Sequence, residues 1–451
     1  MKTLGSWIGA AALVLACASS ASAFCGFYVS GAETSLYANA TMVVLMRSGT
    51  RTVLSMQNDY QGPPEDFAMV VPVPVVLQRD NVKTLPASVF ERVDSLAAPR
   101  LVEYWEADPC RPPQRTRYSV ASARTRGSVD LDRLAESTVH VEARFEVGEY
   151  DVVILSASDS TGLDTWLRAN GYRIPEGAEP VLRPYVAAGT KFFVAKVDVE
   201  RVRFVDGRAV LSPLRFHYDT PEFSLPVRLG LLNSRGSQDL VVHVLAPTRY
   251  EVANYRNVPI PTNLVVPNAT RHSFAHYYEQ LFSRITASEP RTVVTEYAWS
   301  AGSCDPCPTN PLDASELSLL GADVIEGVSP YQMVLTRLHY RYGPGQLGDD
   351  LVFRAASPIV GGRGIPDASG HLPTEIAPSS VDNFQALYVI LHRYQGAIRC
   401  EHPSRGQWGG PEGGRAPAPT SARNTRLFGS QGATPSAPRR SGSVPPSSRR
   451  R

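Results

Sequence analysis

Cys304 and Cys307 are separated by two residues and form the motif of this sequence most suited to chemistry. In an oxidising compartment such a C-x-x-C pair can exchange disulfides, because a lowered thiol pKa activates the attacking thiolate. The strongest redox context places the first cysteine at a helix N-terminus within a βαβ unit. Here Pro308 and Pro311 move the next expected helix, residues 313–320, away from the motif. A structural disulfide is therefore the favoured interpretation, and thiol–disulfide exchange is the alternative.

An odd number of cysteines follows the first 23 residues, so one of them is free, intermolecular or modified. Spacing alone does not choose among the possible pairings. A zinc site at the C-x-x-C would need two more ligands at ordered spacing, and no second Cys or His pair stands nearby. The candidates for disulfide bonding are Cys25, Cys110, Cys304, Cys307 and Cys400.

His272, His276 and Glu279 occupy positions i, i+4 and i+7 of an expected helix, a spacing that can bind a metal. At about 100° per residue they lie opposite the apolar stripe of that helix, on the face expected to meet solvent. A solvated polar face is the favoured interpretation, and we predict neither a metal site nor a cofactor. No Gly-x-Ser-x-Gly elbow, P-loop or Gly-x-Gly-x-x-Gly follows an expected strand, so we predict no catalytic residue.

The first 23 residues have the features of a secretory signal peptide. Lys2 precedes an apolar stretch over residues 7–18, and a small-x-small site ends at Ala23. A second interpretation makes Cys17 the acylated cysteine of a lipoprotein. No other stretch reaches the roughly 18 apolar residues that a membrane helix needs. We therefore expect an exported protein, periplasmic or extracellular, without a membrane span.

Composition is that of an ordinary globular protein, with 43% hydrophobic and 20% charged residues. The net charge of +2 is unevenly placed, because the chain after Gly406 carries eight Arg and one Glu. Residues 406–451 are rich in Gly, Pro, Ser and Arg and are expected to form a disordered tail that could contact an anionic envelope component. The sequence shows no basic stripe on an expected folded face, so we predict no nucleic-acid partner.

One pattern of motifs occurs twice. The first copy begins with Val71–Pro74, continues with an amphipathic helix and a strand that contains Glu-Tyr, and ends with Asp-Pro-Cys at Cys110. The second copy begins with Val258–Pro261, has the same elements in the same order and ends at Cys307. A β-hairpin is expected before each copy, and the second of these has residues 227–232 as its first strand. The repeat predicts an internal duplication.

Strands outnumber helices in this sequence and do not alternate strictly with them. This order favours an α+β fold, mostly antiparallel β with short helices. The folded part is too long for one core, so we expect two similar β-rich halves, residues 24–205 and 206–405. Thr161 is the expected N-cap of a helix in the first half, and residues 361–384 are expected to form a long loop.

Several motifs together resemble one known family. They are Cys25–Tyr28, Tyr60–Phe67, Val71–Pro74, Trp166–Tyr172 and Cys304–Cys307. On these residues the chain, from Phe24 to about Gly410, is similar to the exported bacterial family called domain of unknown function 2330. That family has no assigned activity, so the resemblance implies an envelope or secreted location and no catalytic residues.

The favoured function is that of an exported, non-catalytic binding or structural protein of the bacterial cell envelope, with an unknown ligand. The alternative is a periplasmic thiol–disulfide exchange protein that uses Cys304 and Cys307.

Overall fold

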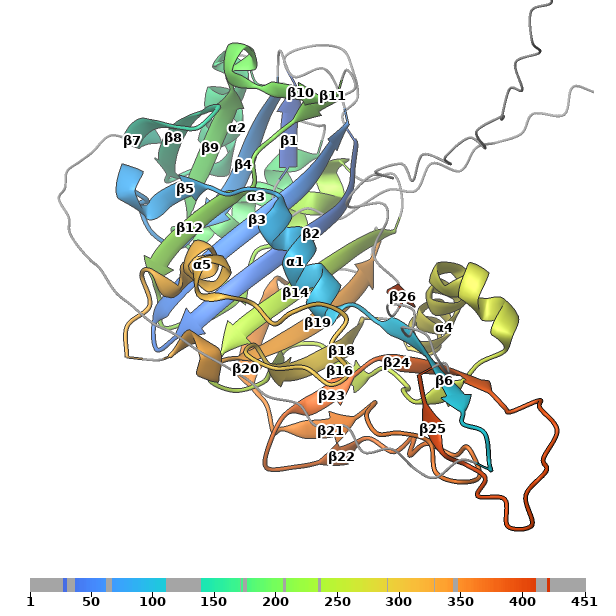
Figure 1. Ribbon diagram of the computed structural model, residues 1–451. Coiled ribbons are helices and arrows are strands. Elements are labelled where there is room, and N and C mark those ends of the chain that lie inside the picture. Colours follow the sequence, from blue (N-terminus) through green and yellow to red (C-terminus); the bar gives the residue numbers. More distant parts are fainter. Residues whose placement is uncertain are drawn as a thin grey trace, which may run out of the picture.

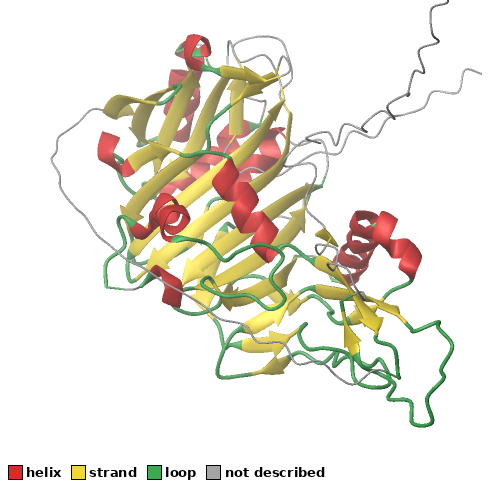
Figure 2. Ribbon diagram, viewed as in Figure 1, coloured by secondary structure: helices red, strands yellow, loops and turns green. Residues whose placement is uncertain are grey.

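Two stacked β-sheets and the helices that cover them make up most of the fold (Figure 1, Figure 2). The computed structural model confirms the expected class, because short helices accompany many strands and most strand pairs are antiparallel. The expected leader, Cys17 and Cys25 lie outside the described residues. The structure describes residues 27–30, 37–61, 67–110, 139–170, 172, 177–205, 208–233, 237–289, 291–327, 329–343, 348–410 and 420–421.

The central sheet is built around β2, whose residues 41–46 are all buried. A strand buried on both faces needs a nearly continuous apolar run, and this segment reads Thr-Met-Val-Val-Leu-Met. Gly49, with φ +53°, supplies the left-handed residue of the turn into β3. β2 also pairs in parallel with β14, which brings distant segments together. In spatial order the strands are β22 (Ala377–Pro378), β21 (Ile359–Gly361), β23 (Asn383–Gln385), β18 (Thr292–Ser300), β19 (Val334–Tyr342), β14 (Gln238–Ala246), β2 (Tyr37–Ser48), β3 (Arg51–Gln61), β12 (Leu214–Asp219) and β5 (Val82–Thr84), with β16 (Arg256–Pro259) beside β18.

A second sheet, the N-terminal sheet, packs on one face of the central sheet and is antiparallel throughout. Val43 of β2 meets Val71 of β4 and Phe193 of β9 in the main core between the two sheets. Helices α2 and α3 cover the opposite face of the N-terminal sheet through residues such as Leu163 and Leu182. The elements are β1 (Phe27–Ser30), β4 (Phe67–Val73), β9 (Lys191–Val197), β8 (Tyr150–Ala157), β7 (Val139–Val147), α2 (Ser160–Ala169) and α3 (Ala178–Ala187).

Helix α1 (Ser88–Ala97) covers the other face of the central sheet. Phe90, Val93 and Leu96 lie on one side of this helix and pack against Val44 of β2 in a second core cluster. The short helix α5 (Ala314–Leu317) and the turn that follows it extend the same cluster. The central sheet therefore has apolar cores on both faces, which explains the almost complete burial of its inner strands, such as β14 and residues 41–46 of β2.

A smaller sheet, the C-terminal sheet, joins segments that are far apart in the chain. β6 pairs in parallel with β24 and antiparallel with β25 and β26. Phe274, Tyr278 and Phe282 recur every four residues on α4 and pack into the adjacent core. Residues 406–410 were expected in the tail but belong to the fold, since β25 pairs with β6 and Trp408 is buried. The elements are β17 (Leu264–Val265), β24 (Leu387–His392), β6 (Arg100–Glu106), β25 (Trp408–Gly409), β26 (Thr420–Ser421) and α4 (Phe274–Ser288).

Two small sheets complete the structure. One contains β13, β20 and β15, and the other is the hairpin of β10 and β11. Among the described residues, no helix has the length and apolar character needed to cross a membrane. The bounds are β13 (Ser224–Leu225), β20 (Leu351–Ala355), β15 (Tyr250–Val252), β10 (Arg203–Val205) and β11 (Arg208–Val210).

The structure does not show the internal duplication. β4 and β16 carry the two Val-Pro motifs but lie in different sheets, as do β6 and β18. The second expected hairpin is wrong, because the 3-10 helix η4 (Arg228–Asn233) replaces its first strand. A short apolar run cannot by itself distinguish a strand from a helical turn. Strands on both sides of position 205 share sheets, as β3 does with β12 and β6 with β24.

Two local expectations are corrected. Asp159, rather than Thr161, caps α2, because its carboxylate accepts a hydrogen bond from the backbone N–H of Gly162 at 2.5 Å. The expected loop over residues 361–384 contains β22 and most of β23. These strands are short and follow glycine- and proline-rich sequence, which explains the missing signal.

Candidate functional site: a buried ion-pair chain and a disulfide loop

Three charged side chains occupy alternate positions on β19: Arg337, His339 and Arg341. Because successive strand residues point to opposite faces, these three share one face, whereas Leu338 between them enters the main core. Helices α1 and α4 contribute side chains that contact this face. Arg337 and His339 are consequently enclosed, with side chains 3% and 12% exposed, whereas the Arg341 side chain is 24% exposed.

The neighbouring strand β18 supplies a carboxylate, Glu296. The register between β18 and β19 shifts between Thr295 and Tyr297, so Glu296 is the extra residue of a β-bulge. Bulges redirect side chains, and this one places the carboxylate against two cations. Nε of Arg337 donates to Oε2 of Glu296 at 2.6 Å, and Nδ1 of His339 lies 2.7 Å from Oε1.

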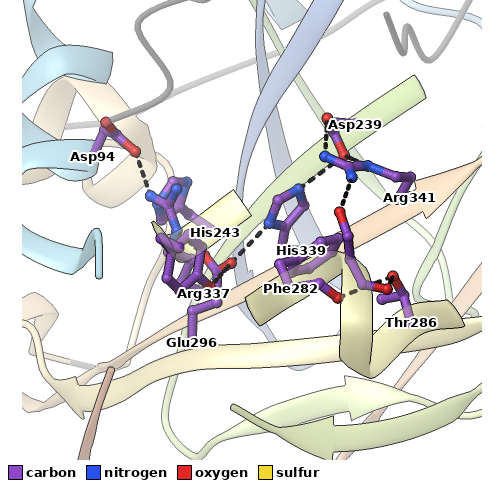
Figure 3. Close-up of polar contacts among 11 residues, drawn as sticks. Asp94, Asp239, His243, Phe282, Thr286, Glu296, Arg337, His339 and Arg341 are labelled. Atoms are coloured by element: carbon purple, nitrogen blue, oxygen red, sulfur yellow. Dashed lines mark hydrogen bonds and ion pairs between the residues drawn. The ribbon is translucent and has the colours of Figure 1, made fainter. Parts of the chain in front are cut away.

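Arg337 also connects the sheet to helix α1. Its Nη1 donates to Oδ1 of Asp94, which lies on α1 and is fully buried. Nε2 of His243 lies 3.2 Å from the same Nη1, and His243 stands directly opposite Arg337 in the β14–β19 ladder. Figure 3 shows how these side chains meet between the helix and the sheet. One buried guanidinium thus binds two buried carboxylates.

The other end of the row connects to α4. Nε2 of His339 lies 3.1 Å from Oδ1 of Asp239, and Arg341 binds both oxygens of Asp239 at 2.6 and 2.8 Å. Phe282 of α4 stacks on His339 with ring centroids 3.9 Å apart. The hydroxyl of Tyr278, also on α4, donates to Glu296. We call this set the ion-pair chain (Figure 3); its members are Asp94, Asp239, His243, Tyr278, Glu296, Arg337, His339 and Arg341.

Burial and ion pairing shift the pKa values in opposite directions. Burial raises the pKa of Glu296, but His339 and Arg337 outweigh it and lower that pKa to about 2. Burial lowers the pKa of His339, but Glu296 and Asp239 outweigh it, so the pKa of His339 is raised overall. These shifts favour a charged Glu296 and a protonated His339 side by side.

The raised pKa of His339 predicts a pH-dependent stability. The folded protein holds the proton of His339 at pH values where the unfolded chain has released it, so this contribution is complete below about pH 6.5. It is lost as the pH rises through the raised folded pKa. We therefore expect the free energy of unfolding to fall more steeply above about pH 6.5 in the wild type than in His339→Gln. Urea unfolding between about pH 5 and about pH 9 measures both slopes.

His243 provides a contrast within the same experiment. Burial, followed by the charge of Arg337, lowers the pKa of His243, so its contribution is present above about pH 6.5 and lost as the pH falls. His243→Gln should therefore flatten the acidic side of the profile and leave the basic side unchanged. Parallel profiles for the wild type and His339→Gln above pH 6.5 would contradict the assigned protonation of His339.

The geometry of the ion-pair chain suits a positioning role. A general acid or base must reach the proton of a bound substrate at about 2.6–3.2 Å. Asp94 and Glu296 are 0% exposed and are already bonded to Arg337. Such a chain fixes the two helices against one strand, because moving either helix would leave a buried charge without its partner.

The second candidate is the loop between β18 and α5, residues 301–313, which we call the disulfide loop. Cys304 and Cys307 are bonded to each other there. Cys307 is exposed, whereas Cys304 is half-buried against the second core cluster. Asp313 caps α5, which begins at Ala314, so neither cysteine stands at a helix N-terminus.

Polar side chains from three elements bind backbone carbonyls of the disulfide loop. Nη1 of Arg100, at the start of β6, donates to the carbonyl oxygen of Pro306 at 3.0 Å. Nε2 of Gln385, at the end of β23, donates to the carbonyl oxygen of Asp305. Arg92 of α1 binds the carbonyl oxygens of residues 310 and 311 and forms an ion pair with Glu316 of α5.

A second disulfide joins Cys110 to Cys400 across 290 residues of sequence. Cys110 lies after β6, and Cys400 lies between β24 and β25, so the bond fixes that segment to the end of β6. A hydrogen bond from the N–H of Ser404 to the carbonyl oxygen of Pro109, 2.8 Å long, holds the same two segments together. Four of the five candidate cysteines are therefore paired, and Cys25 lies outside the described residues.

A family model matches residues 19–354, which is more than half of the 451-residue chain. Its description is "Uncharacterized protein conserved in bacteria (DUF2330)". The chain belongs to this family. The match ends before β21, so it is shorter than the resemblance to about Gly410, and Cys400 lies beyond it. No curated protein and no solved structure matches the chain.

In this DUF2330 protein His272, His276 and Glu279 are exposed, as expected. They do not share one helix, because His272 lies in the 3-10 helix η5 (Asn268–His272), whereas His276 and Glu279 lie on α4. Within the described ranges, no group of three or more His, Cys, Asp or Glu side chains is placed to hold a metal ion. The structure instead places two histidines that the sequence analysis did not single out, His243 and His339, in the ion-pair chain.

The ion-pair chain was missed because its members come from five separate elements. One signal was present in the sequence: Arg337, His339 and Arg341 stand at i, i+2 and i+4 of a strand whose other residues, apart from Thr336, are aliphatic or aromatic. Charges on one face of a buried strand require partners. Which partners these are depends on the tertiary structure alone.

Proposed function

We propose that this chain is an exported, non-catalytic binding or structural protein of the bacterial cell envelope. The Cys110–Cys400 disulfide carries the proposal. Bonds of this kind form and persist in oxidising compartments and are rare in the cytosol. The signal-peptide pattern of residues 1–23 supports the same location, and the family is one of bacterial proteins.

The non-catalytic part of the proposal rests on how the described charged groups are used. The carboxylates, arginines and histidines of the ion-pair chain bind one another, and two helices enclose them. Such an arrangement stabilises a scaffold and gives a substrate little access. The ligand would then bind at the surface of a rigid framework.

Export is tested by expressing the full chain in a bacterial host and mapping its peptides without reduction by mass spectrometry. We expect Phe24 as the N-terminal residue and a linked pair of peptides that contain Cys110 and Cys400. An acylated Cys17 would instead identify a lipoprotein and keep the protein in the envelope. The control lacks residues 2–23 and should stay in the cytosol with Cys110 reduced. A full-length wild-type chain that retains Met1 and reduced Cys110 would overturn the proposal.

The basic end of the chain is a proposed contact to anionic envelope polymer or lipid. Seven arginines and no acidic residue follow position 421, and each would be attracted to a negatively charged surface. Deleting residues 422–451 leaves β25 and β26 intact. If the contact exists, cell fractionation should find less protein in the envelope fraction after the deletion and at high salt. Equal amounts of the wild type and the deletion variant in that fraction would contradict the proposed contact.

Thiol–disulfide exchange through Cys304 and Cys307 is the second candidate, favoured by the exposure of Cys307. An exchange protein must be both accessible and reducible. The reduction potential of the Cys304–Cys307 disulfide distinguishes an exchange site from a structural bond, since a value below about −300 mV identifies an inert structural bond.

A further inference from the structure

We propose that the Cys304–Cys307 disulfide is a redox switch that controls the junction between the central sheet and the C-terminal sheet. The junction consists of Arg100 and residues 385–387, where the chain passes from β23 into β24. The N–H of Arg100 donates to the carbonyl oxygen of Ala386 at 2.9 Å. This regulatory role goes beyond envelope binding and requires no turnover of a substrate.

The two residues inside the disulfide ring face donors from both sheets. Asp305 accepts from Gln385 of the central sheet, and Pro306 accepts from Arg100 of the C-terminal sheet. Both donors are buried: Arg100 is 0% exposed and Gln385 is 1%. A ring of four residues thus presents two adjacent carbonyl groups to donors that have no access to water.

Burial makes these contacts sensitive to the state of the ring. A buried guanidinium that loses an acceptor carries the full desolvation cost of that group. The remaining side-chain bond of Arg100 goes to the carbonyl oxygen of Leu96, on α1. The disulfide holds the two ring carbonyls in place, so its reduction weakens their contacts, and by reciprocity the contacts favour the oxidised form.

The different exposure of the two cysteines determines which sulfur a reductant attacks. A thiolate of a dithiol reductant attacks Sγ of Cys307, the more exposed of the two cysteines, and forms a mixed disulfide with it. The Cys304–Cys307 bond breaks, and its electron pair goes to Sγ of Cys304, which then takes up a proton. The second thiol of the reductant, as its thiolate, displaces Sγ of Cys307, which also takes up a proton, and the reductant leaves as a disulfide. The carbonyl oxygen of Thr309 lies 3.7 Å from Sγ of Cys304 and can accept from the new thiol.

Helix α1 connects the disulfide loop to the ion-pair chain. Arg92 binds the far end of the disulfide loop, and Asp94, two residues later on the same helix, binds Arg337 of the ion-pair chain. Reduction therefore acts on the two sheets and on the helix that is anchored beside them. The N-terminal sheet and α2 lie outside these contacts.

Hydrogen–deuterium exchange read by mass spectrometry tests the effect of reduction. Cys304→Ser/Cys307→Ser keeps Cys110–Cys400 and represents the reduced loop. Exchange in α2 reports the loss of global stability in this variant. Beyond that change, we expect exchange about five- to tenfold faster than in the wild type in β6 and in residues 385–392. Faster exchange confined to residues 301–313 would overturn the switch.

The reciprocal effect is measured on the disulfide itself. Gln385→Leu removes one donor to the ring, and Gln395→Leu is the matched change at an exposed glutamine. In glutathione buffers we expect Cys304–Cys307 to be reduced about three- to tenfold more readily in Gln385→Leu, and as in the wild type in Gln395→Leu. Equal equilibrium constants in both variants, or a wild-type bond that glutathione leaves intact, would refute the proposal. Neither result bears on export.

Discussion

Replacing Arg337 with methionine is expected to lower the free energy of unfolding by about 3–5 kcal/mol. The substitution leaves an unbranched apolar side chain, shorter than arginine, and removes the cation that Asp94 and Glu296 share. Both carboxylates are then buried without that partner, which is the costly case for a buried ion pair. Urea unfolding of the mature protein with both disulfides intact measures the loss.

Two further variants show whether the loss comes from uncompensated charge. Arg354→Met removes an arginine whose side chain is 59% exposed in its pair with Glu251, and it should cost less than about 1 kcal/mol. Adding Glu296→Gln to Arg337→Met neutralises one of the two carboxylates and should recover part of the stability. A loss below 1 kcal/mol for Arg337→Met alone would mean that the ion-pair chain does not anchor α1 and α4.

Removal of the Cys110–Cys400 disulfide is the second large effect. Cys110→Ser/Cys400→Ser should lower the free energy of unfolding by about 5–6 kcal/mol, because the bond closes a loop of 290 residues in the unfolded chain. The folded segment should persist, since Glu106 still accepts hydrogen bonds from the N–H groups of Tyr394 and Gly406. Denaturant unfolding under non-reducing conditions gives the value.

The second disulfide provides the internal comparison. Cys304→Ser/Cys307→Ser opens a ring of four residues, for which the same chain-entropy relation gives only about 2 kcal/mol. The long bond should therefore matter more for global stability, whereas the short bond should matter for local exchange at the sheet junction. If the two double variants lost the same stability, the role assigned to loop length would be wrong.

Several features could be read from local sequence because they depend on neighbours in the chain. The strand-rich class followed from many short apolar runs, and α1 followed from the spacing of Phe90, Val93 and Leu96. The exposure of His276 and Glu279 on α4 followed from the same periodicity, since both lie outside the buried stripe of Phe274, Tyr278 and Phe282. The displacement of α5 from the C-x-x-C followed from prolines.

Other expectations failed where a local signal was ambiguous. The run before β14 has strand-like composition, yet η4 forms there, because a short apolar segment fits a helical turn as well. The internal duplication expected from the repeated motifs is not shown, since the paired motifs lie in different sheets. Matching order along a chain does not fix which strands become neighbours.

The sequence by itself determined the family, the α+β class and the cysteines available for bonding. Tertiary structure alone decided that Cys110 bonds to Cys400, that Glu296 enters a bulge and that Arg337 meets Asp94. The physical reason is that partner choice depends on strand pairing between segments about 40 to 290 residues apart. Local propensity acts over a few residues, whereas charge compensation acts through contacts that exist only after the sheets have formed.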